Sequence, residues 1–387
     1  MNGQSIVVYF RIKGSSTIIR QRIAEYTRDP LVAALWHAIR GTRPLRAISL
    51  DVTRRCNLRC TGCYFFAEEM DHVADASERE FESFVASELA RGTNFVTVLG
   101  GEPSLAAERV RYLAANFRLV VVTNGLRPLP LAGLEQATIA VSVWGDRRTD
   151  RRLRGYNRLD LFERSLANYR HDPRVVWYMT LPPSPSEETE ESVLACIDNG
   201  NLVGFNYYGD LDRVGGDLDH EIGFERARSF VDRMIARYPG HIAFGSYLNT
   251  IVTSGYLKGS RWGYDVCGSI SIADPANASR LANGHSYNPH FNAYGPDLIK
   301  PRRCCVGNER DCKTCRDVWA HMSWIALSLE HHLDNASDFY SWVATIYLFY
   351  GVCGVIDRQE FRGRLAEINR RDSEAVRSPF LAASHSH

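Results

Sequence analysis

The sequence lacks the long apolar segment and the excess of one charge that are typical of membrane and nucleic-acid-binding proteins. Its longest uncharged run, SWVATIYLFYGVCGVI at residues 341–356, is shorter than the ~20 residues that a membrane-spanning helix needs, and it predicts a buried helix. The formal net charge of +1 gives no general attraction to nucleic acid or anionic lipid. Arginines gather at 146–155 and 300–305, so any anion site would be local. We therefore expect no membrane span and no nucleic-acid partner.

The first residues also lack a secretion signal. MNGQSIVVYFRIKG at 1–14 has no basic start, apolar core or small-residue cleavage site. This favours the cytoplasm, where thiols stay reduced. The ten cysteines are then expected to bind metal or take part in catalysis rather than form disulfides. Their distribution agrees, because most of them fall in two clusters, at 56–63 and 304–315.

Short apolar segments alternate with amphipathic ones between residues 47 and 239, and this rhythm predicts an α/β fold. Helices are expected between the strands, including one that begins with the capping pair Ser77 and Glu80. Six successive β-then-α units imply a parallel sheet with right-handed crossovers. Periodicity alone leaves open whether that sheet curls into a partial barrel or stays open. The expected strands are 47–52, 94–100, 118–124, 137–144, 174–180 and 202–208.

Polar and glycine-rich motifs follow four of these strands, at the point where each strand ends. Three cysteines follow the first strand, GGEP the second, TNG the third and SVWG the fourth. In parallel α/β folds the carboxyl ends of the strands meet at one edge, and functional groups collect there. We therefore expect these motifs to form one site.

The three cysteines of CNLRCTGCY, at 56–64, have the spacing C-x3-C-x2-C. Thiolates are the natural ligands of iron–sulfur clusters. Three of them on a four-iron cubane leave one iron without a protein ligand, where a small molecule can bind, much as a catalytic metal keeps an exchangeable position. The alternative is a zinc loop that a remote fourth ligand completes.

With Tyr64 directly after Cys63, this stretch resembles the signature of the radical S-adenosylmethionine (radical SAM) superfamily, and the resemblance extends over residues 46–240. It implies a partial (β/α)6 barrel with a [4Fe–4S] cluster on Cys56, Cys60 and Cys63. In that family S-adenosylmethionine chelates the open iron. Its reductive cleavage gives methionine and a 5′-deoxyadenosyl radical, which takes a hydrogen atom from the substrate. The resemblance also implies an electron donor of the reductase or flavodoxin type.

The motif GGEP, formed by Gly100, Gly101, Glu102 and Pro103, is similar to the family motif that holds the methionine amino group. Two glycines allow the backbone to approach a ligand closely, and a carboxylate can accept hydrogen bonds from an ammonium group. An ordinary strand-to-helix turn would also explain the glycines.

The resemblance assigns the rest of the cofactor site to four side chains. Asn124 and Ser142 are expected at the ribose hydroxyls, and Tyr64 near the adenine. Arg154, at the RG step of DRRTDRRLRG, is expected to pair with the methionine carboxylate, a task that suits a planar guanidinium.

A second cysteine cluster lies in RRCCVGNERDCKTCRD at 302–317. It resembles the shortened cysteine-rich extension, called twitch or SPASM-like, that carries an auxiliary iron–sulfur cluster in several radical enzymes. Adjacent cysteines rarely bind the same metal, so only one of Cys304 and Cys305 is expected to be a ligand. Zinc is the alternative, because four thiolates suit it equally. The expected ligands are Cys267, Cys305, Cys312 and Cys315.

The expected organisation has four parts. A helical preface at 1–45 precedes the radical SAM barrel at 46–240, and a cysteine-rich extension at 241–330 precedes a helical segment and tail at 331–387. The preface is smaller than a winged module of ~80 residues that grasps a leader peptide, which favours a small-molecule substrate such as a nucleoside, an aminoglycoside or another natural-product intermediate.

Substrate contacts are expected where the sixth strand ends, in NYYGD. Asn206, Tyr208 and Asp210 are the candidates, and Tyr207 and Tyr208 cannot both face inward because side chains alternate along a strand. Two alternatives stay within iron–sulfur chemistry: a peptide-modifying enzyme, or a transferase of the 3-amino-3-carboxypropyl group. A non-enzymatic iron–sulfur scaffold or electron carrier is a third alternative, although an electron carrier normally has a fully ligated cluster.

Overall fold

The computed structural model describes residues 16–155, 160–208, 224–254, 269–277, 290–299, 301–302 and 316–375. All six predicted strands form, and they pair in sequence order as a parallel sheet. This confirms the α/β fold class, with a mostly parallel sheet of the partial-barrel type. The strands are β1 (Ala47–Asp51), β2 (Phe95–Leu99), β3 (Arg118–Thr123), β4 (Thr138–Trp144), β5 (Val175–Leu181) and β6 (Leu202–Tyr207).

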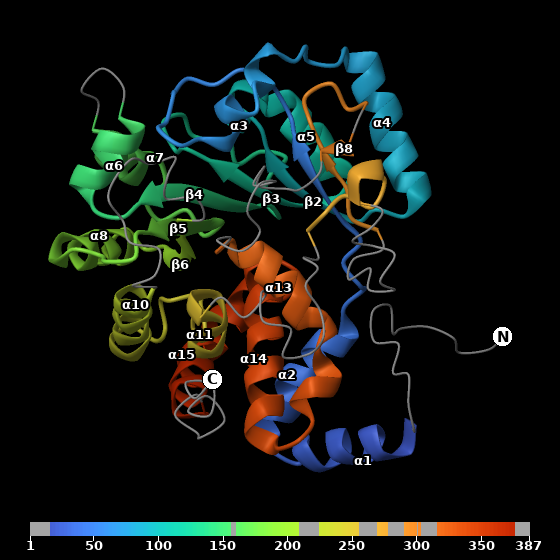
Figure 1. The fold of residues 1–387 in the computed structure, drawn as a ribbon, viewed down its shortest axis with the longest axis vertical. Helices are drawn as coiled ribbons and strands as arrows, with labels where there is room; N and C mark the ends of the chain where they lie inside the picture. Colours follow the sequence, from blue (N-terminus) through green and yellow to red (C-terminus); the bar gives the residue numbers. More distant parts are fainter. Residues whose placement is uncertain are drawn as a thin grey trace.

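Helices follow the strands as predicted and lie outside the sheet (Figure 1). The Ser77 hydroxyl and the Glu80 carboxylate form the expected capping box at the start of α4. The helices that accompany the six strands are α3 (Tyr64–Ala67), α4 (Glu78–Arg91), α5 (Ala107–Asn116), α6 (Arg147–Arg154), α7 (Leu161–Asn168), α8 (Glu187–Asp198) and α10 (Glu225–Arg237).

Helices from the two ends of the described chain pack together below the sheet (Figure 1). Trp36 of α2 lies 6.3 Å from Trp342 of α14 between ring centroids. Asp29 caps α2 by accepting from the backbone N–H groups of Leu31 and Val32, as its position before Pro30 predicts. These helices are α1 (Ser16–Tyr26), α2 (Pro30–Gly41), α11 (Ser246–Ser254), α13 (Val318–Leu327), α14 (Ala336–Val352) and α15 (Arg358–Ala375).

Both faces of the sheet are buried. On one face Trp177 packs against Phe162 of α7, with ring centroids 6.1 Å apart. On the other face Val120 and Ala140 pack in a cluster with Cys353, next to the C-terminal end of α14. The C-terminal helices thus cover the face of the sheet that the β–α units leave open, and this explains why α14 is apolar on all sides.

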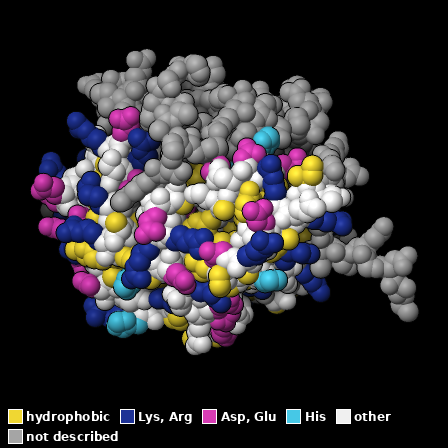
Figure 2. All heavy atoms as spheres, turned by 90° about the horizontal axis from the view of Figure 1, so that it is seen from below, with side chains coloured by type: hydrophobic (Ala, Val, Ile, Leu, Met, Phe, Trp, Pro, Cys, Tyr) yellow, Lys and Arg dark blue, Asp and Glu magenta, His cyan; other side chains and the backbone are white. Residues whose placement is uncertain are grey.

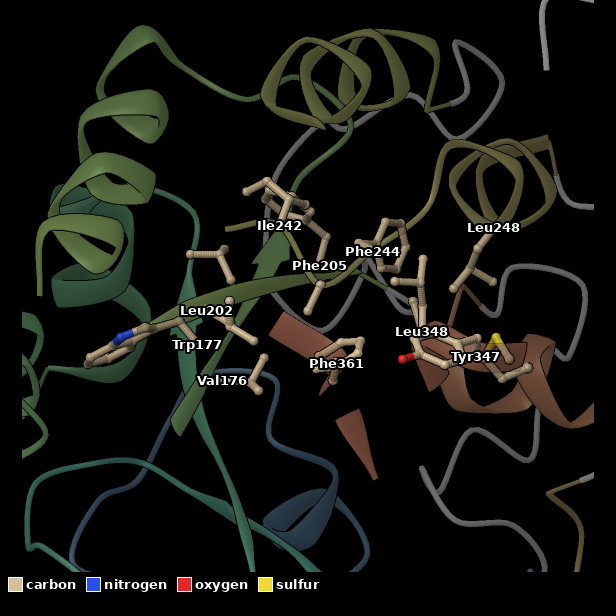
Figure 3. Close-up of a cluster of buried hydrophobic side chains, with 14 of the residues drawn as sticks. Val176, Trp177, Leu202, Phe205, Ile242, Phe244, Leu248, Tyr347, Leu348 and Phe361 are labelled. Atoms are coloured by element: carbon tan, nitrogen blue, oxygen red, sulfur yellow. The ribbon is translucent and has the colours of Figure 1, made fainter. Parts of the chain in front are cut away.

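The edge of the sheet beside β6 is covered rather than left open. Ile242 bridges to Val203 in parallel register, and Phe244 packs on Phe205 with ring centroids 5.9 Å apart. Figure 3 shows Ile242, Phe205 and Phe244 close to one another and to Leu348 of α14. The core therefore continues from the sheet into the C-terminal helices.

The sheet also has two strands that the sequence analysis did not anticipate. Beyond residue 241 the α/β rhythm stops, but β7 (Ala293–Tyr294) pairs with β1 in parallel and β8 (Pro301–Arg302) pairs with β7 antiparallel. The strand order is β6-β5-β4-β3-β2-β1-β7-β8. Two-residue strands carry no periodicity, so no pattern could predict them.

The described charged residues on one face of the molecule are mixed in sign. Figure 2 shows one face on which acidic and basic side chains are interspersed without a large patch of one sign. Among the described helices, none is both long and apolar enough to cross a membrane.

Candidate functional site

A cavity of about 300 Å³ lies at the carboxyl ends of the strands. It brings together nearly all the described residues that the sequence analysis selected. Pro103 does not line the cavity. It begins a 3-10 turn, Pro103–Ala106, which follows Glu102 in the sequence. The selected residues that line the cavity are Cys56, Cys60, Cys63, Tyr64, Gly100, Gly101, Glu102, Asn124, Ser142, Arg154, Asn206 and Tyr208.

Five of the predicted residues cannot be placed. Asp210 and the four expected auxiliary ligands, Cys267, Cys305, Cys312 and Cys315, lie outside the described residues. Their roles remain predictions.

The three cysteines of the loop after β1 are free thiols, half-buried against the cavity. Burial raises the pKa of Cys56 to about 12 and that of Cys63 to about 11. The pKa of Cys60 is also raised by burial, although the charge of Arg154 opposes the shift. Burial thus favours the protonated form of these thiols, and a metal that binds there must displace their protons.

The three thiols line one cavity. Thiolates are the natural ligands of iron–sulfur clusters, and in a cubane each thiolate binds a different iron atom. The loop therefore has the donor set that such a cluster needs.

The two glycines of GGEP hold this motif against the cysteine loop. The backbone N–H of Gly101 donates to the Thr53 carbonyl at 2.9 Å, and that of Glu102 donates to the Arg55 carbonyl at 2.8 Å. A Cβ at Gly101 would lie 2.2 Å from the Arg55 carbonyl oxygen, and Gly100 has a φ of 125°. The glycines therefore allow the GGEP backbone to lie against the backbone of residues 53–55, which directly precede Cys56.

Glu102 is oriented by donors from the neighbouring strand end. Only 1% of its surface is exposed. One carboxylate oxygen accepts from the Ser104 N–H at 2.9 Å and the Thr123 hydroxyl at 2.6 Å, and the other accepts from the Asn124 N–H at 2.9 Å. A carboxylate has about four acceptor positions, so these bonds fix the group and leave acceptor capacity toward the cavity.

Arg154 holds several parts of the site together. Its guanidinium forms a buried ion pair with Asp150 at 2.8 Å, contacts the Ser142 carbonyl, and donates to the Asn124 carbonyl at 3.3 Å. It also hydrogen-bonds to Cys60. Much of its donor capacity is thus used within the protein, and its pairing with a methionine carboxylate remains a prediction.

Beneath the cysteine loop lies a buried network that the sequence analysis missed. The Tyr64 hydroxyl donates to Asp51 at 3.1 Å. Arg302 of β8 lies 3.2 Å from the same carboxylate and stacks over the Tyr64 ring at 5.2 Å. Burial raises the pKa of both Asp51 and Tyr64. The sequence signal for Asp51 is a single carboxylate in the apolar run AISLDV. Arg302 has no such signal, because only the pairing of β8 brings it to the site.

The β6 side of the cavity contains a second carboxylate that sequence reasoning missed. Asp317 caps α13 by accepting from the Ala320 N–H at 2.9 Å, and it lines the cavity. Burial raises the pKa of Asp317 to about 6. Its position before an apolar helix reads as an ordinary N-cap, so only the fold places it beside Asn206, whose side-chain oxygen accepts from the Val318 N–H at 3.1 Å.

Tyr207 ends β6, Tyr208 follows it, and both residues line the cavity. The Tyr207 hydroxyl hydrogen-bonds to Asn249 of α11. The Tyr208 ring lies 5.4 Å from the Trp144 ring between centroids. Tyr208 and Trp144 therefore form an aromatic wall at the end of β4 and β6.

Comparison with known proteins agrees with this geometry. The family model described as the radical SAM superfamily matches residues 50–195. This segment contains the cysteine loop, GGEP, Asn124, Ser142 and Arg154.

Curated relatives match about a quarter of the chain. The chain is 28% identical over 116 residues to an Fe-coproporphyrin III synthase of Methanosarcina barkeri, covering 27% of this chain and 29% of that protein. It is 31% identical over 119 residues to a GTP 3′,8-cyclase of Acidothermus cellulolyticus, covering 26% of this chain and 33% of that protein. The match spans about a third of the length of these relatives.

The solved structures that align with the chain are more distant in sequence. Streptococcus suis SuiB bound to the precursor peptide SuiA aligns at 13% identity with a TM-score of 0.43, covering 78% of this chain and 68% of that one. A structure titled native anSMEcpe with bound AdoMet aligns at 12% identity with a TM-score of 0.41, covering 76% of this chain and 100% of that one.

Proposed function

We propose that this protein is a radical SAM enzyme that acts on a small-molecule substrate. In this proposal Cys56, Cys60 and Cys63 hold a [4Fe–4S] cluster with S-adenosylmethionine at its open iron. The observation that carries it is that three free thiols from one loop line the same cavity as Glu102 and Asn124. When reduced, such a cluster supplies the electron that cleaves S-adenosylmethionine and releases a 5′-deoxyadenosyl radical.

The residues around the cavity support specific binding roles for the cofactor. Glu102 is held by three donors and keeps acceptor capacity for the methionine amino group. The side chain of Asn124 is fixed by donating to the Asn57 side-chain oxygen at 2.8 Å, which suits a residue that must meet the ribose in one orientation. The Arg154–Asp150 pair joins the strand ends around it, so we assign Arg154 a positioning role as well as a contact with the methionine carboxylate.

We also propose that the second cysteine cluster holds an auxiliary [4Fe–4S] cluster on Cys267, Cys305, Cys312 and Cys315, as in twitch or SPASM-like extensions. What supports this is the position of the described residues on either side of 303–315. Arg302 contacts Tyr64, and Asp317 lines the cavity. A cluster on the intervening segment would be suited to accept an electron from a substrate radical or to anchor the substrate.

The proposed enzyme needs an external one-electron donor of the reductase or flavodoxin type and a reducing compartment, so we place it in the cytoplasm. A small-molecule substrate is favoured because the described cavity is compact, at about 300 Å³, and must also accommodate the cofactor.

Anaerobic reconstitution with iron and sulfide tests the proposal. About four irons per chain are expected from the first loop alone, and about eight if the auxiliary cluster also forms. The electron paramagnetic resonance spectrum of the reduced protein should change when S-adenosylmethionine is added, because the cofactor binds the open iron. A sample that binds only zinc, or a spectrum that does not respond to the cofactor, would contradict the proposal.

A further inference from the structure

We infer that the β6 side of the cavity binds a cationic group of the substrate, an ammonium or a guanidinium, through Asp317 and the aromatic pair Trp144 and Tyr208. The inference rests on the proposed function, since it takes this cavity to be the substrate site. It goes further by naming the charge that the substrate carries.

The first argument comes from the charged groups that line the cavity: Glu102, Arg154 and Asp317. Arg154 is paired with Asp150 at 2.8 Å. Glu102 accepts three hydrogen bonds from N–H and hydroxyl donors, and the proposed function assigns its remaining acceptor capacity to the methionine amino group. Asp317 is 8% exposed, and the groups of the described residues that hydrogen-bond to its carboxylate are neutral and belong to Asn206, Trp319 and Ala320.

No described arginine, lysine or histidine forms an ion pair with Asp317. Burying a carboxylate without a cationic partner costs free energy, because no ion pair offsets the loss of its hydration. A positively charged ligand would offset that free-energy cost, whereas the Asp317 carboxylate would repel a substrate that carries a phosphate.

Helix capping alone does not account for a charged residue at this position. Asn335 caps α14 with a neutral amide by accepting from the Asp338 N–H at 2.9 Å, and asparagine caps helices about as well as aspartate. Asp160, which caps α7, keeps its carboxylate at an exposed position. Capping α13 therefore does not require a charged side chain, and the free-energy cost of burying the Asp317 carboxylate has no explanation in the cap.

The second argument is independent and comes from Tyr208. Its side chain is 5% exposed, and its hydroxyl has no hydrogen-bond partner among the described residues. Buried hydroxyl groups are normally hydrogen-bonded, so the cavity lacks a donor or acceptor at this point. An ammonium or guanidinium has several N–H groups and could donate to Asp317 and to this hydroxyl together.

The aromatic wall adds a third contact that favours a cation over a neutral group. The rings of Trp144 and Tyr208 lie 5.4 Å apart and are tilted by 49°, and both residues line the cavity. The faces of indole and phenol rings attract organic cations. Together, one carboxylate, one hydroxyl and two aromatic rings describe a recognition site for a small organic amine.

A binding comparison that needs no cluster tests the inference. The probes are benzylamine and its neutral isostere benzyl alcohol, titrated into the purified full-length protein by saturation-transfer NMR. We expect benzylamine to bind about tenfold more tightly or better, which is the usual effect of a hydrogen bond to a charged group. Asp317→Asn keeps the helix cap and removes the charge, so the preference should disappear. Tyr208→Phe should weaken benzylamine binding by about threefold.

Asp160→Asn is the matched control, because it changes a capping aspartate outside the cavity and should leave the preference intact. Circular dichroism confirms that each variant is folded. Equal binding of benzylamine and benzyl alcohol to the wild-type protein overturns the inference without any variant, and so does a preference that survives in folded Asp317→Asn.

A second arm distinguishes the source of the cation. The peptide N-acetyl-Gly-Lys-Gly-amide carries the same ammonium group, and tighter binding of benzylamine than of this peptide supports a small-molecule amine. Tighter binding of the peptide overturns that substrate class. Because these measurements use protein without a cluster, their failure is separate from failure of the proposed function, which is read from a reconstituted sample.

Discussion

The contact between GGEP and the cysteine loop predicts a large effect for the smallest possible substitution, Gly101→Ala. The new methyl group would lie 2.2 Å from the carbonyl oxygen of Arg55, so the two segments must separate by about 1 Å to reach ordinary contact. Gly101 has no positive φ, which means that backbone conformation does not oppose alanine and that the effect is steric.

The magnitude follows from the bonds that this separation breaks. Gly101 and Glu102 each donate a backbone hydrogen bond across the contact, at 2.9 and 2.8 Å, and each is worth about 1 kcal/mol. Residual strain adds about 1 kcal/mol or more. We expect the free energy of unfolding to fall by about 3 kcal/mol and, because Cys56 follows Arg55 directly, iron loading to fall as well.

Urea unfolding and iron content after anaerobic reconstitution measure the two effects. Gly363→Ala is the control, since nothing lies within 4 Å of the added methyl group and alanine favours the helix that contains it. The reasoning is refuted if Gly101→Ala matches Gly363→Ala in both stability and iron content.

Three further predictions concern buried groups. Burial raises the folded-state pKa of Asp372 from 3.8 to about 7, so its contribution to stability is present below pH 4 and is lost as pH rises through 7. Asp372→Asn should therefore be more stable than wild type by up to about 4 kcal/mol above pH 7, and should show no such gain below pH 4. Urea unfolding midpoints at both pH values measure this difference. Arg154→Met leaves the Asp150 carboxylate buried without its cation and should cost about 3–5 kcal/mol in urea unfolding; a loss under 1 kcal/mol would argue against the buried pair. Gly351→Ala places a methyl group 2.1 Å from the Phe361 ring and should destabilise the protein by about 1–3 kcal/mol while iron loading of the folded fraction stays normal; reduced iron loading would show that α14 and the cysteine loop are coupled.

The sequence was most informative where local pattern and topology coincide. The six strands were predicted because runs such as FVTVL and LVVVT are apolar and regularly spaced, which buried parallel strands require. Cys56, Glu102, Asn124 and Ser142 were expected in one site for a topological reason, namely that parallel strands end at the same edge. The cavity contains all four.

What the sequence did not reveal depends on long-range packing. Asp317 reads as an N-cap, and it becomes a site residue only because α13 packs near the end of β6. Arg302 reads as one of several local arginines, and its contact with Tyr64 depends on strands of two residues each. Neither position has a local signal, because each contact joins residues more than 100 positions apart in the chain.

The central claim is that the three cysteines hold a cluster that cleaves S-adenosylmethionine, and the most direct measurement is product analysis after reduction. We predict that anaerobically reconstituted, dithionite-reduced protein converts S-adenosylmethionine to 5′-deoxyadenosine and methionine, and that Cys60→Ser abolishes this conversion. Formation of methylthioadenosine instead, or no cleavage by a protein with full iron content, would contradict the account.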